Sequence, residues 1–146
     1  MILKNAFRLK EIVRSYKIDL IHARSRAPAW SAYLAAQMAK VPFVTTFHGS
    51  YNFEETFLGR FNKAYNSVMA RGEGVIAISQ YIQDHILAHY EKNLKPNALH
   101  LINRGVDLKE FNKASVLESR VQALKKQWSI TNNHKVILVP GRLTRW

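Results

Sequence analysis

The stretch Val41–Ser50 reads VPFVTTFHGS, and its composition predicts a strand that ends in a polar turn. The β-branched and aromatic residues after Pro42 favour a strand, and proline is tolerated near a strand's first residue. Gly49 has no Cβ that would keep a ligand away from the backbone. Open parallel sheets bind their ligands at this carboxyl edge. We therefore predict a ligand-binding turn at His48, Gly49 and Ser50, with an ordinary turn after a buried strand as the alternative.

Working outward from this stretch, the chain alternates between strand and helix patterns. Apolar runs predict further strands over residues 19–24, 75–78, 99–102 and 135–139. Apolar residues at helical spacing predict helices over residues 2–16, 28–38, 57–69, 79–90 and 115–128. This alternation predicts an α/β fold with a doubly wound parallel sheet.

Several helices carry specific local signals. Pro28 is expected at the first helical position, and Ser79 is expected to cap the helix that follows it. Ser115 and Glu118 have the spacing of a capping box. A stripe over residues 57–69 is expected in the core and consists of Phe57, Leu58, Phe61, Tyr65, Val68 and Met69.

Other polar residues follow the predicted strands at the same edge as His48. Arg24 and Arg26 come after the first strand and beside a helix N-terminus, where anions are favoured. A solvated loop position is the alternative for each arginine. Two arginines together at this edge favour a substrate-facing role.

Composition narrows the class of partner. The 146 residues carry a net charge of +12, from 22 Lys and Arg against 10 Asp and Glu, and contain no cysteine. This charge favours anionic partners such as phosphorylated substrates, nucleic acid or an anionic membrane surface. The basic residues are scattered and no nucleic-acid-binding motif accompanies them, so nucleic acid is disfavoured. No apolar run approaches the ~20 residues of a spanning helix, and the N-terminus does not resemble a signal peptide.

The six histidines do not predict a metal site. Among them, His85 and His89 share helical i, i+4 spacing, but residue 86 is Ile rather than the Glu of a zinc protease. The chain also lacks the phosphate loop and the nucleophile elbow. The absence of these motifs leaves the type of reaction undetermined.

The order of the motifs resembles a known family. These motifs are the segments at residues 19–22, 42–49, 75–79, 103–107 and 141–143. Together they look like the bacterial retaining glycosyltransferases with two Rossmann-like domains, the GT-B architecture of family 4-like enzymes. The resemblance covers nearly the whole chain and implies sugar transfer from a nucleoside diphosphate sugar, with retention, no other cofactor and no essential metal. The expected acceptor is a glycan, a lipid or another cell-envelope precursor.

The resemblance also implies roles for individual residues. His48 matches the catalytic cleft near the transferred sugar, and the N-terminal domain supplies the acceptor contacts. The expected cleft-lining residues are Gly49, Ser50, Arg24, Arg26 and Ser79. Arg142 resembles the arginine that pairs with the donor diphosphate, with Gly141 beside it, and Gly105 and Asp107 match the turn before the interdomain crossing.

The chain departs from the family pattern in three ways. It lacks the usual first strand and glycine-rich loop, it has Arg104-Gly105 in place of Asn-Gly, and it lacks the later Lys-Gly and Glu-x7-Glu elements. We therefore expect residues 1–134 to be a partial N-terminal domain and residues 135–146 to begin a C-terminal donor-binding domain. Such a fragment is expected to be inactive by itself.

The resemblance implies a cytoplasmic protein, with peripheral contact to the inner face of the membrane. The alternative function is a nucleotide- or phosphate-binding α/β module without transferase activity.

Overall fold

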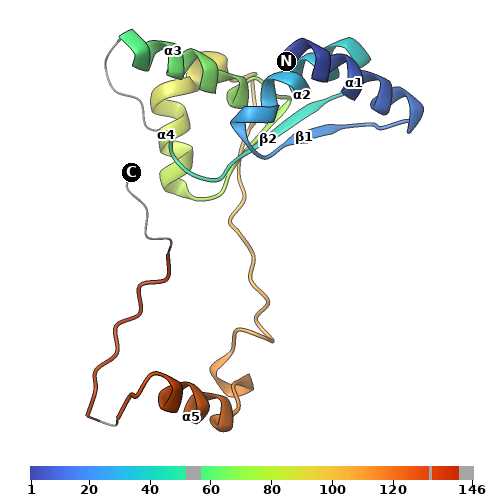
Figure 1. Ribbon diagram of the computed structural model, residues 1–146. Coiled ribbons are helices and arrows are strands. Elements are labelled where there is room, and N and C mark those ends of the chain that lie inside the picture. The colour runs from blue at the N-terminus through green and yellow to red at the C-terminus, as the bar shows by residue number, and fades with distance from the viewer. Residues whose placement is uncertain (52–56, 132, 142–146) are drawn as a thin grey trace. The chain divides into compact units, whose positions relative to one another are not determined.

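The computed structural model describes residues 1–51, 57–131 and 133–141, and the side chains of Phe57 and Leu58 also lie outside the description. The chain forms two compact units, Met1–Arg104 and Gly105–Trp146 (Figure 1). The expected domain boundary after residue 134 falls inside the second unit and stays a prediction.

The first unit is built on four parallel strands. They are β1 Ile21–Ala23, β2 Phe43–Phe47, β3 Gly74–Ala77 and β4 Leu99–Leu101. Their spatial order is β1-β2-β3-β4, and one row across the sheet joins Ala23, Thr45, Val75 and Leu99. The prediction of an α/β fold with a parallel sheet is therefore confirmed, and the segment quoted first supplies an inner strand.

Helices precede the sheet and connect its strands. They are α1 Ile2–Ser15, α2 Arg26–Ala39, α3 Phe57–Asn66, the 3-10 helix η1 Ser67–Ala70, α4 Gln80–Tyr90 and the 3-10 helix η2 Glu91–Asn93. Right-handed crossovers between strands in sequential order place their connecting helices on the same face of the sheet. Helix α1 packs on α2, as Figure 1 shows.

The core lies between the helices and one face of the sheet. Its strand residues include Phe43 and Phe47, and its helical residues include Met69, Ile86 and Tyr90, all nearly or fully buried. Side chains alternate along a strand, so the intervening residues point to the other face. On that face His22 is exposed and bonds through Nε2 to Thr46 Oγ1 at 2.8 Å.

The apolar stripe predicted over residues 57–69 is only partly in the core. Val68 and Met69 are fully buried, whereas Phe61 is 59% exposed and Tyr65 39% exposed. The buried pair lies in η1, which contacts β2 and α2, whereas α3 packs against η1. The core assignment of Phe61 and Tyr65 is therefore wrong, because periodicity marks an apolar side of a helix but not what covers it.

The start of α2 also differs from the expectation. Ser25 is the N-cap residue, so Pro28 is the third helical residue rather than the first. Proline is tolerated there because the N–H groups of the first helical turn have no acceptor within the helix.

One close backbone contact joins β2 to the segment before β3. The Glu73 N–H donates to the Phe43 carbonyl at 2.8 Å, and a Cβ on Gly72 would lie 2.5 Å from the same oxygen. The Glu73 carboxylate accepts from the Phe43 N–H at 2.7 Å and pairs with Lys95. Glycine is therefore required at position 72 by packing and not by a special backbone angle.

The second unit contains the 3-10 helix η3 Lys113–Ser115 and helix α5 Glu118–Gln127. The predicted capping box is wrong, because Leu117 is the N-cap residue and makes no side-chain cap. The Ser115 hydroxyl instead donates to the carbonyls of Glu110 and Asn112, at 3.0 and 2.7 Å. A hydroxyl that bonds locally in this way competes with helix capping.

The strand predicted over residues 135–139 is not formed. Residues 134–140 have no regular secondary structure, and Ile137 and Val139 are 90% and 85% exposed. A strand is stabilised by hydrogen bonds to a neighbour, and the described sheet ends at β4. Across the described ranges, no helix has both the length and the apolar character needed to cross a bilayer.

Candidate functional site

The carboxyl edge of the sheet brings together residues that are far apart in the sequence. Arg24 directly follows β1, His48 directly follows β2, and Arg104 comes three residues after the end of β4. All four strands are parallel, so their carboxyl ends lie at one edge.

His48 lies between the two arginines. Arg24 Nε is 3.3 Å from His48 Nε2, and Arg104 Nη2 is 2.7 Å from His48 Nδ1. The Ile102 N–H donates to the Ala77 carbonyl at 2.9 Å, which continues the β3–β4 ladder beyond β4. This pairing positions Arg104 so that its long side chain crosses the end of β3 and reaches His48.

The surroundings of His48 favour a neutral ring. Partial burial lowers the pKa of His48, and the charges of Arg104, Arg24 and His22 lower it further. At neutral pH the imidazole therefore has one N–H donor and one acceptor nitrogen. It can accept a hydrogen bond from one of the two arginines but not from both.

Arg26 lies in a different environment from Arg24. Its Nη1 donates to Asn66 Oδ1 at 3.2 Å, and its guanidinium lies 5.4 Å from the centre of the Tyr51 ring. These contacts fix the start of α2 against the residues that precede η1. The structure does not bring Arg26 to His48, and its role in lining the cleft stays a prediction.

Three more predicted residues lie after β2 and β3. The Ser79 hydroxyl accepts from the Ile82 N–H at 3.3 Å, so its predicted role as the N-cap residue of α4 is confirmed. A Cβ on Gly49 would meet nothing within 4 Å, and Gly49 does not have a positive φ. The fold itself therefore does not require glycine at position 49, and Ser50 beside it is half-buried.

Comparison with known proteins identifies the family. The model of Glycosyltransferase Family 4 matches residues 1–110, about three quarters of the chain. The chain belongs to glycosyltransferase family 4.

Individual relatives and solved structures are also similar to the chain. Alpha-monoglucosyldiacylglycerol synthase from Acholeplasma laidlawii is 24% identical over 143 residues, which is 91% of this chain and 36% of that protein. The crystal structure of a glycosyltransferase from Rickettsia africae ESF-5 is 37% identical with a TM-score of 0.77, covering 99% of this chain and 37% of that one.

A further crystal structure shares the fold. Anabaena Alr3699/HepE in complex with UDP-glucose is 21% identical with a TM-score of 0.66, covering 86% of this chain and 33% of that one. The family 4 chain described here thus spans about a third of the length of each of these proteins. The resemblance inferred from the motifs is confirmed for the family and the fold.

The remaining predicted site residues lie in the second unit. Asp107 Oδ1 accepts from the N–H groups of Lys109 and Glu110, at 2.8 and 3.3 Å, and so stabilises a local turn. Gly105 and Gly141 both face open space, and Arg142 lies outside the described residues. The expected roles of these four residues in the interdomain turn and the donor-phosphate site stay predictions.

Arg104 is the residue of the edge cluster that was not predicted as a site residue. In the family comparison it appeared as a variant of asparagine beside Gly105. Its position shortly after the last strand of the sheet could have identified Arg104 as a site residue, because ligand-binding residues of parallel sheets follow the ends of the strands. Its contact with His48 spans 56 positions of sequence.

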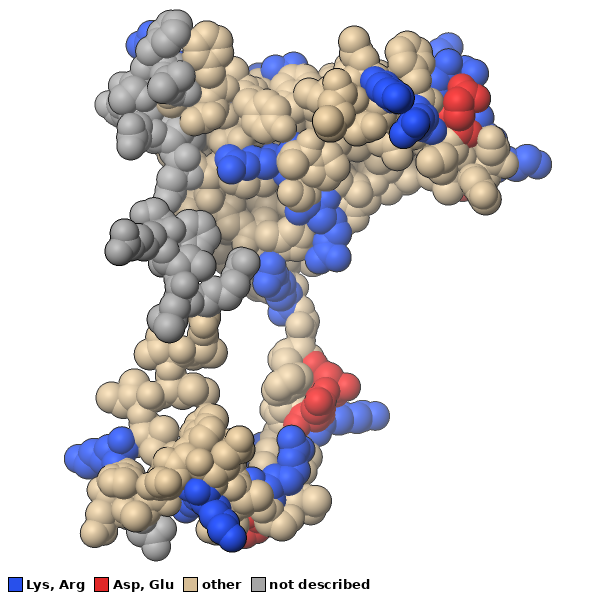
Figure 2. All heavy atoms as spheres, in the orientation of Figure 1, with Lys and Arg blue, Asp and Glu red and all other residues tan. Residues whose placement is uncertain are grey.

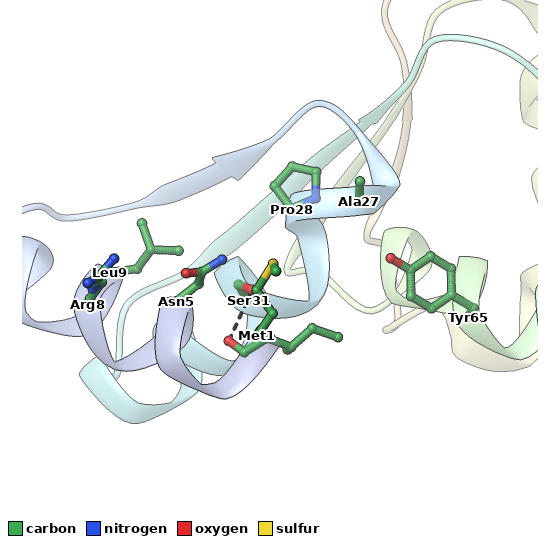
Figure 3. Close-up of a pocket in the computed structure, with 9 residues that line it drawn as sticks. Met1, Asn5, Arg8, Leu9, Ala27, Pro28, Ser31 and Tyr65 are labelled. Carbon is green, nitrogen blue, oxygen red and sulfur yellow. Dashed lines mark hydrogen bonds between the residues drawn. The ribbon is translucent and has the colours of Figure 1, made fainter.

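A separate cavity lies between α1 and the start of α2. Its volume is about 500 Å³, and the residues lining it are Met1, Ile2, Asn5, Arg8, Leu9, Ala27, Pro28, Ser31 and Tyr65. Figure 3 shows Tyr65 on the far side from Leu9 and Arg8, and the Ser31 hydroxyl bonds the Ile2 carbonyl at 3.2 Å. None of these residues belongs to the His48 cluster, so the cavity and the edge cluster are distinct features.

The described residues are strongly basic and contain no cluster of side chains placed to bind a metal ion. Figure 2 shows many more basic than acidic side chains on the visible face, in keeping with the net charge of +12. Within the described ranges, no group of three or more His, Asp or Glu side chains is placed to hold a metal ion. The expected independence of metal stays a prediction.

Proposed function

We propose that the protein to which this chain belongs transfers a sugar from a nucleoside diphosphate sugar to an acceptor hydroxyl, with retention of anomeric configuration. The observation that carries this proposal is the position of His48 between Arg24 and Arg104 at the carboxyl edge, in a family 4 chain. The UDP-glucose complex of the Anabaena neighbour supports a nucleotide-sugar donor.

In this reaction the bond between the anomeric carbon and the diphosphate oxygen breaks, and the acceptor oxygen bonds to the same face of the sugar. Negative charge grows on the departing diphosphate, and its oxygen takes up the proton that the acceptor hydroxyl loses. Fixed cations stabilise such charge, a role we assign to Arg142 beside Gly141. His48 lies near the transferred sugar, Gly105 and Asp107 form the interdomain turn, and the chemistry needs no metal.

The test is transfer by the complete protein from a panel of nucleoside diphosphate sugars, with the product's anomeric configuration read by NMR. We expect a retained configuration and unchanged turnover in EDTA. Binding of a nucleotide sugar without transfer to any acceptor would instead favour a nucleotide-binding module. Loss of turnover in EDTA, restored by a divalent cation, would contradict the metal-independent part of the proposal.

We propose a glycan or lipid of the cell envelope as the acceptor, and a cytoplasmic location at the inner face of the membrane. The name of the Acholeplasma relative denotes a glucosylated diacylglycerol product and supports a lipid acceptor. Helix α1 adds a surface suited to this location. Its residues Leu3, Phe7, Lys10 and Arg14 share one side at helical spacing, and Leu3 and Phe7 are 65% and 55% exposed.

An apolar and basic helical side of this kind binds anionic bilayers. We expect the chain to sediment with vesicles that contain anionic phospholipid and to bind zwitterionic vesicles less. Phe7→Asp should reduce sedimentation by roughly an order of magnitude, because it removes buried apolar area and adds a repelled charge. Phe61→Asp, at another exposed phenylalanine, is the matched control. Equal losses in the two variants would remove α1 as the binding surface.

A further inference from the structure

We propose that Arg24, His48 and Arg104 form a binding site for a phosphoryl group. The site lies at the carboxyl edge of the first unit and uses residues that follow β1, β2 and β4. Its assignment to a substrate rests on the proposed function, whereas the binding itself does not.

The first argument is a mismatch of donors and acceptors. Arg24 and Arg104 contact opposite nitrogens of one imidazole, at 3.3 and 2.7 Å. A neutral imidazole offers one acceptor, so one of these contacts brings a guanidinium donor against a ring N–H. An anion placed among the three groups would accept from both guanidinium groups and from the ring N–H, which removes the mismatch.

The second argument is uncompensated charge. Neither arginine forms an ion pair with a carboxylate within residues 1–51, 57–131 and 133–141. Both side chains are exposed and His48 is half-buried, so an anion from solvent can reach all three. Two fixed guanidinium groups without an acidic partner favour an anion of more than one charge.

The third argument is the start of α2, which begins two residues after Arg24. The side chain of its N-cap residue Ser25 makes no capping hydrogen bond, and the first turn contains no acidic residue. In α4, by contrast, Ser79 caps the helix. The positive end of the α2 dipole is therefore left uncompensated beside Arg24 and adds to the attraction for an anion.

These features select a phosphoryl group over a carboxylate. The three donor groups point from three strand ends, and a phosphoryl group presents three terminal oxygens where a carboxylate presents two. The guanidinium fork pairs well with phosphate oxygens. Two sources share this chemistry, namely the diphosphate of a nucleotide sugar and a phosphate on the acceptor.

The primary experiment measures binding of inorganic pyrophosphate to the chain by calorimetry. Arg24→Gln and Arg104→Gln should each weaken binding by roughly 10- to 100-fold, the scale for one charge-assisted contact. Arg60→Gln, which removes the same charge from an exposed position on α3, should change affinity less than about threefold. Equal weakening by all three substitutions would overturn the proposal in favour of binding by net charge.

A second measurement uses the unmodified chain and needs no variant to fold. The charged groups that face His48 are Arg24 and Arg104, with His22 on β1 also contributing. In the free chain partial burial and these charges keep the pKa of His48 below its ordinary value, and a bound anion should raise it. An NMR titration of the imidazole with saturating pyrophosphate should show this upward shift, and an unmoved pKa would overturn the proposal.

Two further ligands distinguish the sources. If UDP loses affinity in Arg104→Gln as pyrophosphate does, the site holds the donor diphosphate. If UDP is unaffected while glycerol 3-phosphate is weakened, the site holds an acceptor phosphate. Weakening of neither ligand contradicts a substrate role. Because no arm measures sugar transfer, failure of the binding site and failure of the proposed transferase activity are separate results.

Discussion

Replacement of His48 by alanine is expected to lower the turnover of the complete protein at least ~100-fold, the usual scale for a group that handles a proton or stabilises charge at the reacting centre. His48 directly follows β2 and lies between Arg24 and Arg104 at the edge where we place the sugar. The measurement is kcat with a saturating nucleotide sugar. Thermal unfolding of the variant should be nearly unchanged, because His48 is only half-buried.

His100→Ala is the matched control for this substitution. His100 is an exposed histidine within β4 and is not part of the edge cluster. We expect its turnover to stay within about twofold, in the range of a surface substitution. Near-normal turnover in His48→Ala would show that His48 is a turn residue without a catalytic role.

The lowered pKa of His48 predicts how the rate of sugar transfer depends on pH. Partial burial and the neighbouring cations lower the pKa of His48, so the neutral ring persists below the usual titration range. Because kcat/KM reports the pKa of the free enzyme, kcat/KM should fall as the pH drops through this lowered pKa, where a proton occupies the acceptor nitrogen. The acid limb should disappear in His48→Gln, which retains a hydrogen-bonding side chain but does not titrate.

Replacement of Phe43 by alanine is expected to cost roughly 3–5 kcal/mol of the free energy of unfolding, the range for a fully buried phenylalanine. Phe43 is fully buried on β2, and its ring lies 5.5 Å from that of Tyr33 in an edge-on arrangement. The substitution removes this contact and leaves a cavity under α2. Urea denaturation of the chain, followed by circular dichroism, measures the change.

Phe61→Ala is the matched control for Phe43→Ala. Phe61 belongs to the apolar stripe that was expected in the core, yet its side chain is 59% exposed. We expect its substitution to cost less than about 1 kcal/mol, as at other surface positions. Comparable losses at positions 43 and 61 would show that α3 packs more tightly than the structure indicates.

The sequence predictions were most accurate where the interactions involved join residues close together along the chain. Val41–Ser50 correctly predicted a strand, which a bend at Gly49 follows, because β-branched residues, proline and glycine act on their own backbone. Ser79 was correctly expected to cap α4 for the same reason. At Ser115 two local arrangements competed for one hydroxyl, and the carbonyls of Glu110 and Asn112 were preferred to the helix.

The sequence by itself determined the order of strands and helices, the family, and the presence of His48 at a strand end. Tertiary structure decided which arginines accompany that histidine. Arg24 and Arg26 are two residues apart, yet Arg24 contacts His48 while Arg26 contacts Asn66. Arg104 reaches His48 across the end of β3. Side-chain direction and strand order set these contacts, and both depend on how the whole sheet assembles rather than on neighbours along the chain.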